Sequence, residues 1–273
     1  RFNLIINGGQ LLESMDKLGL ANLTASLLNK GTKNKSVNEL EESIKELGAS
    51  IYVSSSKESI NISVTTLSKN HKATLSLVEE MLLQPRFDEN EFNLLKKATI
   101  SNIRQQQANP NSVARNVYNK LIYGDDNIRS KNILGTLNSV SSITLDDVKL
   151  FYKNYFSPSV AKILAVGNIE KEKLVNSLKS MELNWKPVKV SIPVYNTPNK
   201  PSKSLVYFYD IPNSKQSILQ FGAPALSATD SDYYPAYIMN YILGGGGFAS
   251  RLTQELREGK GYTYGISSGF YGT

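Results

Sequence analysis

Apolar residues recur at helical spacing through most of the first 185 positions. Residues 38–47 place Leu40, Ile44 and Leu47 three or four positions apart, and Gly48 follows where a helix commonly ends. A second helix signal is the Thr-Leu-Asp-Asp run that starts at Thr144, with a threonine cap and acids in the first turn. We therefore predict a helix starting at Thr144 and further helices over residues 18–30, 38–47, 73–83, 89–107, 112–122 and 170–180.

Strand patterns, in contrast, alternate apolar and polar residues. Ile60, Ile62 and Val64 alternate in this way, and Lys57-Glu58 precedes them as a hairpin turn. The first residues of the chain also read as a strand. The pattern predicts further strands over residues 50–54, 59–65, 161–166, 205–209 and 218–223, and one that begins near Tyr264. Helices over residues 232–243 and up to Arg257 complete the set, and the mixture without strict βαβ alternation indicates an α+β fold.

A proline-rich stretch divides the chain. Residues 186–203 contain four of the ten prolines and little periodicity, which is typical of a linker. We predict a first domain over 1–185, a linker over 186–203 and a second domain over 204–273. The 70 residues of the second domain are few for a domain, so we expect this domain to be truncated in the given chain.

Composition removes several classes of function. The chain has no cysteine and a single histidine, His71, so it cannot build a cysteine metal site or a histidine cluster. Its net charge of +7 comes from dispersed Lys and Arg residues without a nucleic-acid motif, which predicts no nucleic-acid partner. No apolar run is long enough for a transmembrane segment, and no signal-peptide core opens the chain. The compartment stays undetermined.

The most informative segment runs from Glu13 to Thr32. An acidic residue, Glu13, precedes Gly19-Leu20-Ala21, and Lys30-Gly31-Thr32 closes the segment. This frame resembles the pitrilysin and mitochondrial-processing-peptidase family of zinc metallopeptidases, the inverzincins. In that family the frame encloses His-x-x-Glu-His, whose histidines hold zinc on one helix face while the Glu activates the metal-bound water.

The resemblance places the zinc-site positions on residues that lack this chemistry. The two histidines fall on Asn22 and Ser26, the catalytic Glu on Ala25, and the remaining Glu ligand on Asn102. An amide and a hydroxyl are poor zinc ligands, and alanine carries no base. We therefore expect no metal and no catalytic residue in this chain, with zinc only in a partner chain.

Further segments carry the same resemblance. Tyr123-Gly124, Gly135-Thr136 and the stretch 142–152 match one family region, and 157–168 match the next. The resemblance runs through essentially the whole chain. It implies two related domains, each a largely antiparallel sheet with helices packed on one face.

After the linker the resemblance implies substrate contacts. Arg257 and Tyr264 stand seven residues apart, as do an Arg and a Tyr that reach the zinc site from the second domain in the family and bind substrate. Arg257 as a helix-end cation and Tyr264 as an ordinary strand aromatic are the structural alternative. The glycine run matches a substrate loop of the processing peptidases; it lacks the Lys-Ser/Thr of a phosphate loop, and its alternative is a flexible helix entry. The run comprises Gly244, Gly245, Gly246 and Gly247.

These observations predict a non-catalytic subunit. It would pair with a catalytic zinc-peptidase chain that carries an intact HxxEH motif, or with another copy of the fold, and would help to enclose an extended peptide substrate. The alternative is a structural or assembly protein of the same fold with no part in proteolysis.

Overall fold

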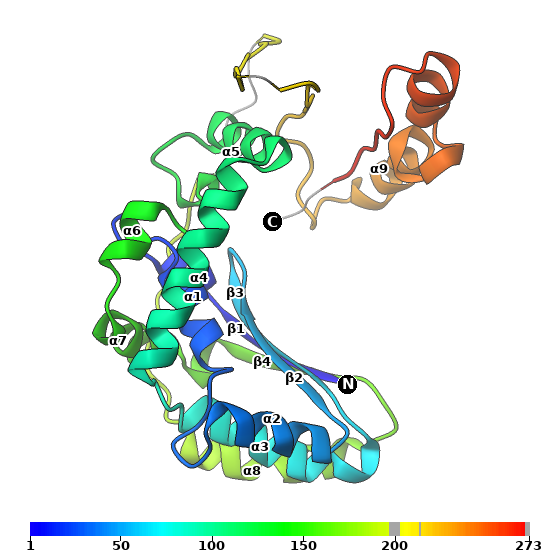
Figure 1. Cartoon of the computed structure of the whole chain (residues 1–273). Helices are drawn as coiled ribbons and strands as arrows, with labels where there is room; N and C mark the ends of the chain where they lie inside the picture. The colour runs from blue at the N-terminus through cyan, green and yellow to red at the C-terminus, as the bar shows by residue number, and fades with distance from the viewer. Residues whose placement is uncertain (197–202, 213, 271–273) are drawn as a thin grey trace. The chain divides into compact units, whose positions relative to one another are not determined.

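The fold is α+β, with four strands in one antiparallel sheet and helices packed on one of its faces (Figure 1). The computed structural model describes residues 1–196, 203–212 and 214–270. These residues form two compact units. The first contains Arg1–Asn196 and Val206–Gln220, and the second contains the remaining described residues, 203–205 and 221–270.

The sheet has the order β2-β3-β1-β4. Residue alternation decides which side of it is buried, because Leu4 of β1 lies opposite Ile62 of β3, and Ile62 lies opposite Val53 of β2. Alternate positions such as Tyr52 are exposed. The strands are β1 (Phe2–Asn7), β2 (Ser50–Ser55), β3 (Ser59–Thr65) and β4 (Ala161–Ala165).

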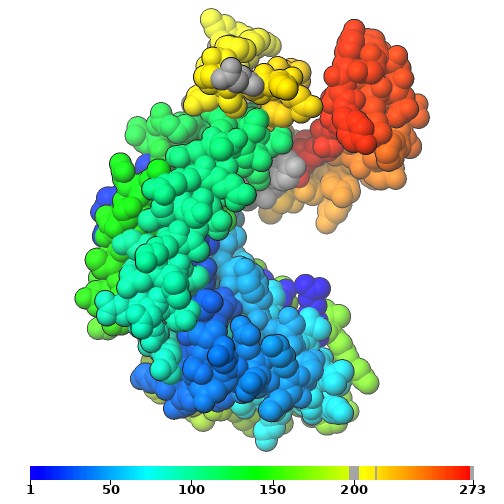
Figure 2. All heavy atoms as spheres, in the orientation of Figure 1, coloured from blue at the N-terminus to red at the C-terminus, as the bar shows by residue number. Residues whose placement is uncertain are grey.

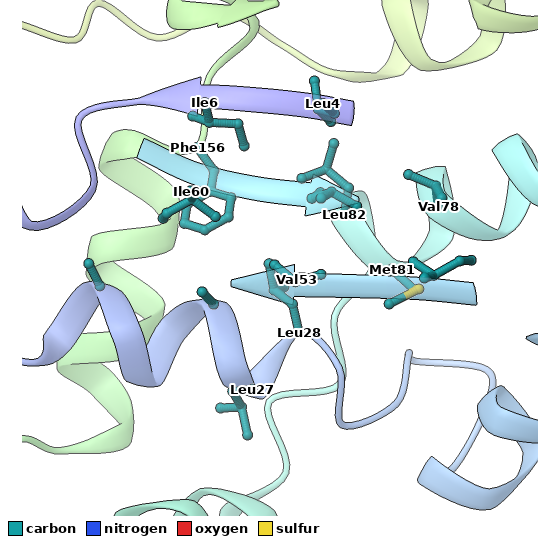
Figure 3. Close-up of a cluster of buried hydrophobic side chains, with 14 of the residues drawn as sticks. Leu4, Ile6, Leu27, Leu28, Val53, Ile60, Val78, Met81, Leu82 and Phe156 are labelled. Carbon is teal, nitrogen blue, oxygen red and sulfur yellow. The ribbon is translucent and has the colours of Figure 1, made fainter. Parts of the chain in front are cut away.

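The helices of the first unit, α5 excepted, pack on the apolar side of this sheet. They are α1 (Leu20–Leu27), α2 (Val37–Glu46), α3 (His71–Leu83), α4 (Glu89–Gln107), α5 (Pro110–Tyr123), α6 (Leu137–Ser142), α7 (Leu145–Tyr155) and α8 (Lys171–Asn184). One core joins all of them except α5 to the strands, and Figure 3 shows part of it. The side chains labelled there come from β1, β2, β3, α1, α3 and the residues that end α1 and α7: Leu4, Ile6, Leu27, Leu28, Val53, Ile60, Val78, Met81, Leu82 and Phe156.

Trp185 closes this core at the end of α8. Its side chain is buried, and its indole N–H donates to the carbonyl of Phe156 at 3.0 Å. Residues 186–196 then continue without helix or strand, and 197–202 of the predicted linker lie outside the described residues. The domain division over 1–185, 186–203 and 204–273 stays a prediction.

The second unit consists of short helical segments, coloured orange to red in Figure 2. They are α9 (Tyr233–Asn240), the π-helical segments η5 (Tyr241–Gly245) and η7 (Thr253–Gly259), and the 3-10 turn η6 (Gly247–Ala249). The predicted strands over 205–209 and 218–223, and the one from Tyr264, are wrong for the described residues, which have no regular structure there. Strands need hydrogen-bonded neighbours, and the described residues supply none at these positions.

Candidate functional site

The helix α1 carries three of the four positions that the resemblance assigns to zinc chemistry. Gly19, with a left-handed φ of 96°, directs the chain into α1, and the Glu13 carboxylate caps its first turn. Its two oxygens accept the backbone N–H groups of Gly19 at 3.0 Å and Ala21 at 2.7 Å. The acidic residue of the frame therefore anchors the helix start.

Glu13 is itself deeply buried. Burial raises the pKa of its carboxyl from 4.5 to about 8, which outweighs the two N–H donors that lower it. The same donors lie at a helix N-terminus, where a negative charge is favoured. Burial thus makes Glu13 a much weaker acid than an ordinary glutamate, and Glu13 lies outside the four positions that the resemblance assigns to zinc.

The four motif positions differ in their surroundings. Ala25 has no exposed surface and belongs to the hydrophobic core, whereas Asn22 and Ser26 are half-buried. Asn102 is exposed on α4, a helix that packs against α1. The structure thus brings the helices of all four positions together, and a core methyl group lies at the position that the resemblance assigns to the catalytic base.

The side chains that could bind a metal ion are dispersed over the described part of the chain. There, no group of three His, Cys, Asp or Glu residues is arranged to hold a metal ion. His71 is half-buried at the start of α3, where its ring nitrogens lie 2.8 Å from the carbonyl of Ser68 and 3.2 Å from the hydroxyl of Ser177. Its ring therefore links α3 to α8.

Arg257 and Tyr264 meet in the second unit. The Arg257 guanidinium carbon lies 5.0 Å from the centre of the Tyr264 ring and 4.6 Å from that of Phe248, so the cation contacts two aromatic rings. Its Nε lies 3.3 Å from a carboxylate oxygen of Glu258. Sequence spacing pairs Arg257 with Tyr264 but misses Phe248, and the only signal for it is an aromatic directly after the glycine run.

The glycine run leads into this cluster. Gly244 is buried, and a Cβ there would lie 2.7 Å from the backbone nitrogen of Ser268. Gly247 has a left-handed φ of 62°, which disfavours any other residue at that position. The run therefore has a structural reason of its own, and its role as a substrate loop stays a prediction.

The fold and the frame from Glu13 to Thr32 define an inverzincin-type chain without the zinc motif. Residues 1–132 match the family described as Insulinase (Peptidase family M16), and residues 142–273 match Peptidase M16 inactive domain. The chain belongs to peptidase family M16.

The names of the curated relatives describe a non-peptidase homolog in one case and an uncharacterized zinc protease in the other. The chain is 26% identical over 267 residues to "Non-peptidase homolog YmxG" of Helicobacter pylori, covering 97% of this chain and 60% of that protein. It is also 26% identical to "Uncharacterized zinc protease YmxG" of Bacillus subtilis, covering 96% of this chain and 63% of the relative. The chain thus spans less than two thirds of the length of these relatives.

Solved structures share the fold. A peptidase M16 inactive domain from Pseudomonas fluorescens is 25% identical, with a TM-score of 0.83 over 99% of this chain and 65% of that one. A protease from Helicobacter pylori is 20% identical, with a TM-score of 0.78 over 95% of this chain and 63% of that one. Within the described ranges, no helix combines the length and apolarity needed to cross a membrane.

Proposed function

We propose that this chain is a non-catalytic subunit of a zinc metallopeptidase complex. It pairs with a chain that carries an intact HxxEH site and contributes Arg257 and Tyr264 to the binding of an extended peptide. Zinc belongs to the partner. The observation that carries the first part of the proposal is Ala25, a core methyl group where the catalytic Glu would stand.

The arrangement of Arg257 and Tyr264 supports the second part. A guanidinium and a phenol can both donate hydrogen bonds to a peptide carbonyl or to the oxyanion of a tetrahedral intermediate. Tyr264 is 89% exposed and makes no contribution to a hydrophobic core, yet it lies against the guanidinium. A protein that serves only as a scaffold has no evident need for this pair.

The test uses the native protein with its co-purified partner and a peptide that the pair cleaves. Arg257→Ala and Tyr264→Phe should leave pairing intact and slow turnover by about 10²–10³-fold, the usual effect of removing an oxyanion donor. The loss should fall on kcat and not on KM, because such donors act mainly as charge develops.

Control variants distinguish a substrate-binding subunit from a structural or assembly protein. Arg251→Ala removes an exposed arginine of the same unit that has no aromatic partner in the described residues. A complex with this variant should cleave the peptide at the wild-type rate. Elemental analysis of the pair should find one zinc, which remains when Asn22 of this chain is changed to Ala. Wild-type cleavage by both the Arg257 and the Tyr264 variants would favour the structural or assembly protein instead.

A further inference from the structure

The Arg257 guanidinium contacts two exposed rings. It lies 4.6 Å from the ring centre of Phe248 and 5.0 Å from that of Tyr264, and it is the one cation in the described ranges that lies against two aromatic rings. Phe248 is 67% exposed in the given chain, and its ring lies within cation–π distance of the Arg257 guanidinium.

We propose that Phe248 is a positioning residue that holds the Arg257 guanidinium for a peptide carbonyl or carboxylate oxygen. This inference rests on the substrate-binding role proposed above for Arg257. Phe248 itself donates no hydrogen bond to the peptide. It acts by restricting the side chain that does.

Local backbone geometry places Phe248 over the cation. Gly247 adopts a left-handed φ of 62° immediately before it, and the turn η6 that contains Phe248 packs against η7, which carries Arg257. A side chain at position 247 would meet no atom within 4 Å, so the requirement for glycine is conformational. The turn η6 thus places the Phe248 ring against η7, the helical segment that follows it closely in the chain.

Restriction matters because a free arginine side chain samples many rotamers. Three groups contact the guanidinium: the rings of Phe248 and Tyr264, and the Glu258 carboxylate, which lies 3.3 Å from Nε. The two terminal nitrogens have no hydrogen-bond acceptor among the described residues. A guanidinium ordered in advance loses less conformational freedom when it binds an acceptor oxygen.

The first test measures Arg257 alone, without a partner or peptide. Phenylglyoxal modifies accessible arginines, and mass spectrometry of proteolytic peptides gives a rate for each site. Phe248→Leu keeps an apolar side chain but removes the ring, and should raise the modification rate of Arg257 by about two- to fivefold relative to the exposed Arg251. Phe248→Tyr keeps the ring and should leave the rate unchanged.

Tyr262→Leu is the matched control, because Tyr262 is a 77% exposed aromatic of the same unit that lies over no cation in the described structure. It should leave the Arg257 rate as it is. An equal rate in Phe248→Leu and wild type would overturn the positioning role. A higher modification rate of Arg257 in both Phe248→Leu and Phe248→Tyr would also overturn it, since the loss of protection would then not depend on the aromatic ring.

The second test uses the complex with its catalytic partner. Phe248→Leu should lower kcat in the same direction as Arg257→Ala but less, with rescue by Phe248→Tyr. If Arg257→Ala slows cleavage and Phe248→Leu does not, the positioning role fails and the proposed function stands. If Arg257→Ala has no effect, the proposed function fails, and the modification rates still decide whether Phe248 holds the guanidinium.

Discussion

Glu13 shows how a single buried carboxyl can tie folding to pH. Its carboxyl is buried at the start of α1 and has a pKa of about 8 in the folded chain, against 4.5 for an ordinary Glu. The folded state therefore holds a proton that the unfolded state has lost between these two values. The contribution of Glu13 to the free energy of unfolding is full below pH 4.5 and falls as the pH rises to about 8.

Glu13→Gln should abolish this dependence. Urea unfolding at pH 5, 6, 7 and 8 should show wild-type stability falling more steeply with pH than that of the variant. Glu39→Gln is the control, because hydrogen bonds from Ser36 lower the pKa of this exposed carboxyl and its contribution is constant above pH 5. A difference between wild type and Glu13→Gln that does not change over this range would show that Gly19 and Ala21 hold Glu13 in its charged form throughout.

The residue types at the positions that the resemblance assigns to zinc could be predicted from the sequence, but their surroundings could not. The frame around Asn22, Ala25 and Ser26 shows which chemistry is missing, because residue type alone decides whether a side chain can bind zinc. It does not show that Ala25 is fully buried, since burial depends on which elements pack over that face of α1. Nor does spacing reveal Phe248, whose contact with Arg257 depends on a turn.

Among the elements, α7 shows how a short sequence signal sets a helix start. Thr144 and Asp147 form a reciprocal capping box, in which the threonine hydroxyl accepts the Asp147 N–H at 3.2 Å and the carboxylate accepts the Thr144 N–H at 2.8 Å. Lys17, from the loop before α1, lies 2.8 Å from the same carboxylate. The cap therefore also ties α7 to the segment that leads into α1.

Thr144→Ala should lower the free energy of unfolding by about 1 kcal/mol, the usual cost of losing a side-chain cap. Thr144→Ser keeps the hydroxyl and should cost much less. The midpoint of urea unfolding at constant slope measures both. Equal midpoints for the alanine and serine variants would show that the hydroxyl does not stabilise α7.

Periodic elements were predictable where local signals and packing agree. The structure has the 89–107 helix and the 59–65 strand at the predicted bounds, because an Asp cap and strict alternation define them locally. The helix α6 was missed, since six residues offer too short a pattern. Residues 205–209 form a short run of apolar and aromatic residues, as a buried strand does, but strand pairing depends on two segments and cannot be predicted from one.

At the scale of the given chain, which spans less than two thirds of the length of its curated relatives, burial is distributed unevenly. Every buried hydrophobic side chain in the described residues lies at or before Trp185, whereas the second unit exposes many aromatic rings, Tyr234 and Tyr264 among them. Apolar burial is the main source of folding free energy. The two units should therefore differ in local stability.

Hydrogen exchange followed by mass spectrometry should reveal this difference. Amides of β1 and β3 should exchange slowly, through global unfolding, whereas those of α9 and η7 should exchange by local opening at much lower free energy. Similar protection in the strands and in α9 would contradict the expectation. Addition of mild urea provides a check, since only globally protected amides should respond strongly to it.

The Glu13 cap of α1 has a consequence for how far this fold depends on metal. The start of the helix is fixed by Glu13 through two backbone N–H groups, and the core fixes its inner face. A chelator should therefore leave the fold of this chain unchanged, unlike that of small domains whose folding free energy comes from zinc. When the stability of a fold does not come from bound metal, mutations can replace the metal-binding side chains one at a time while the protein stays folded.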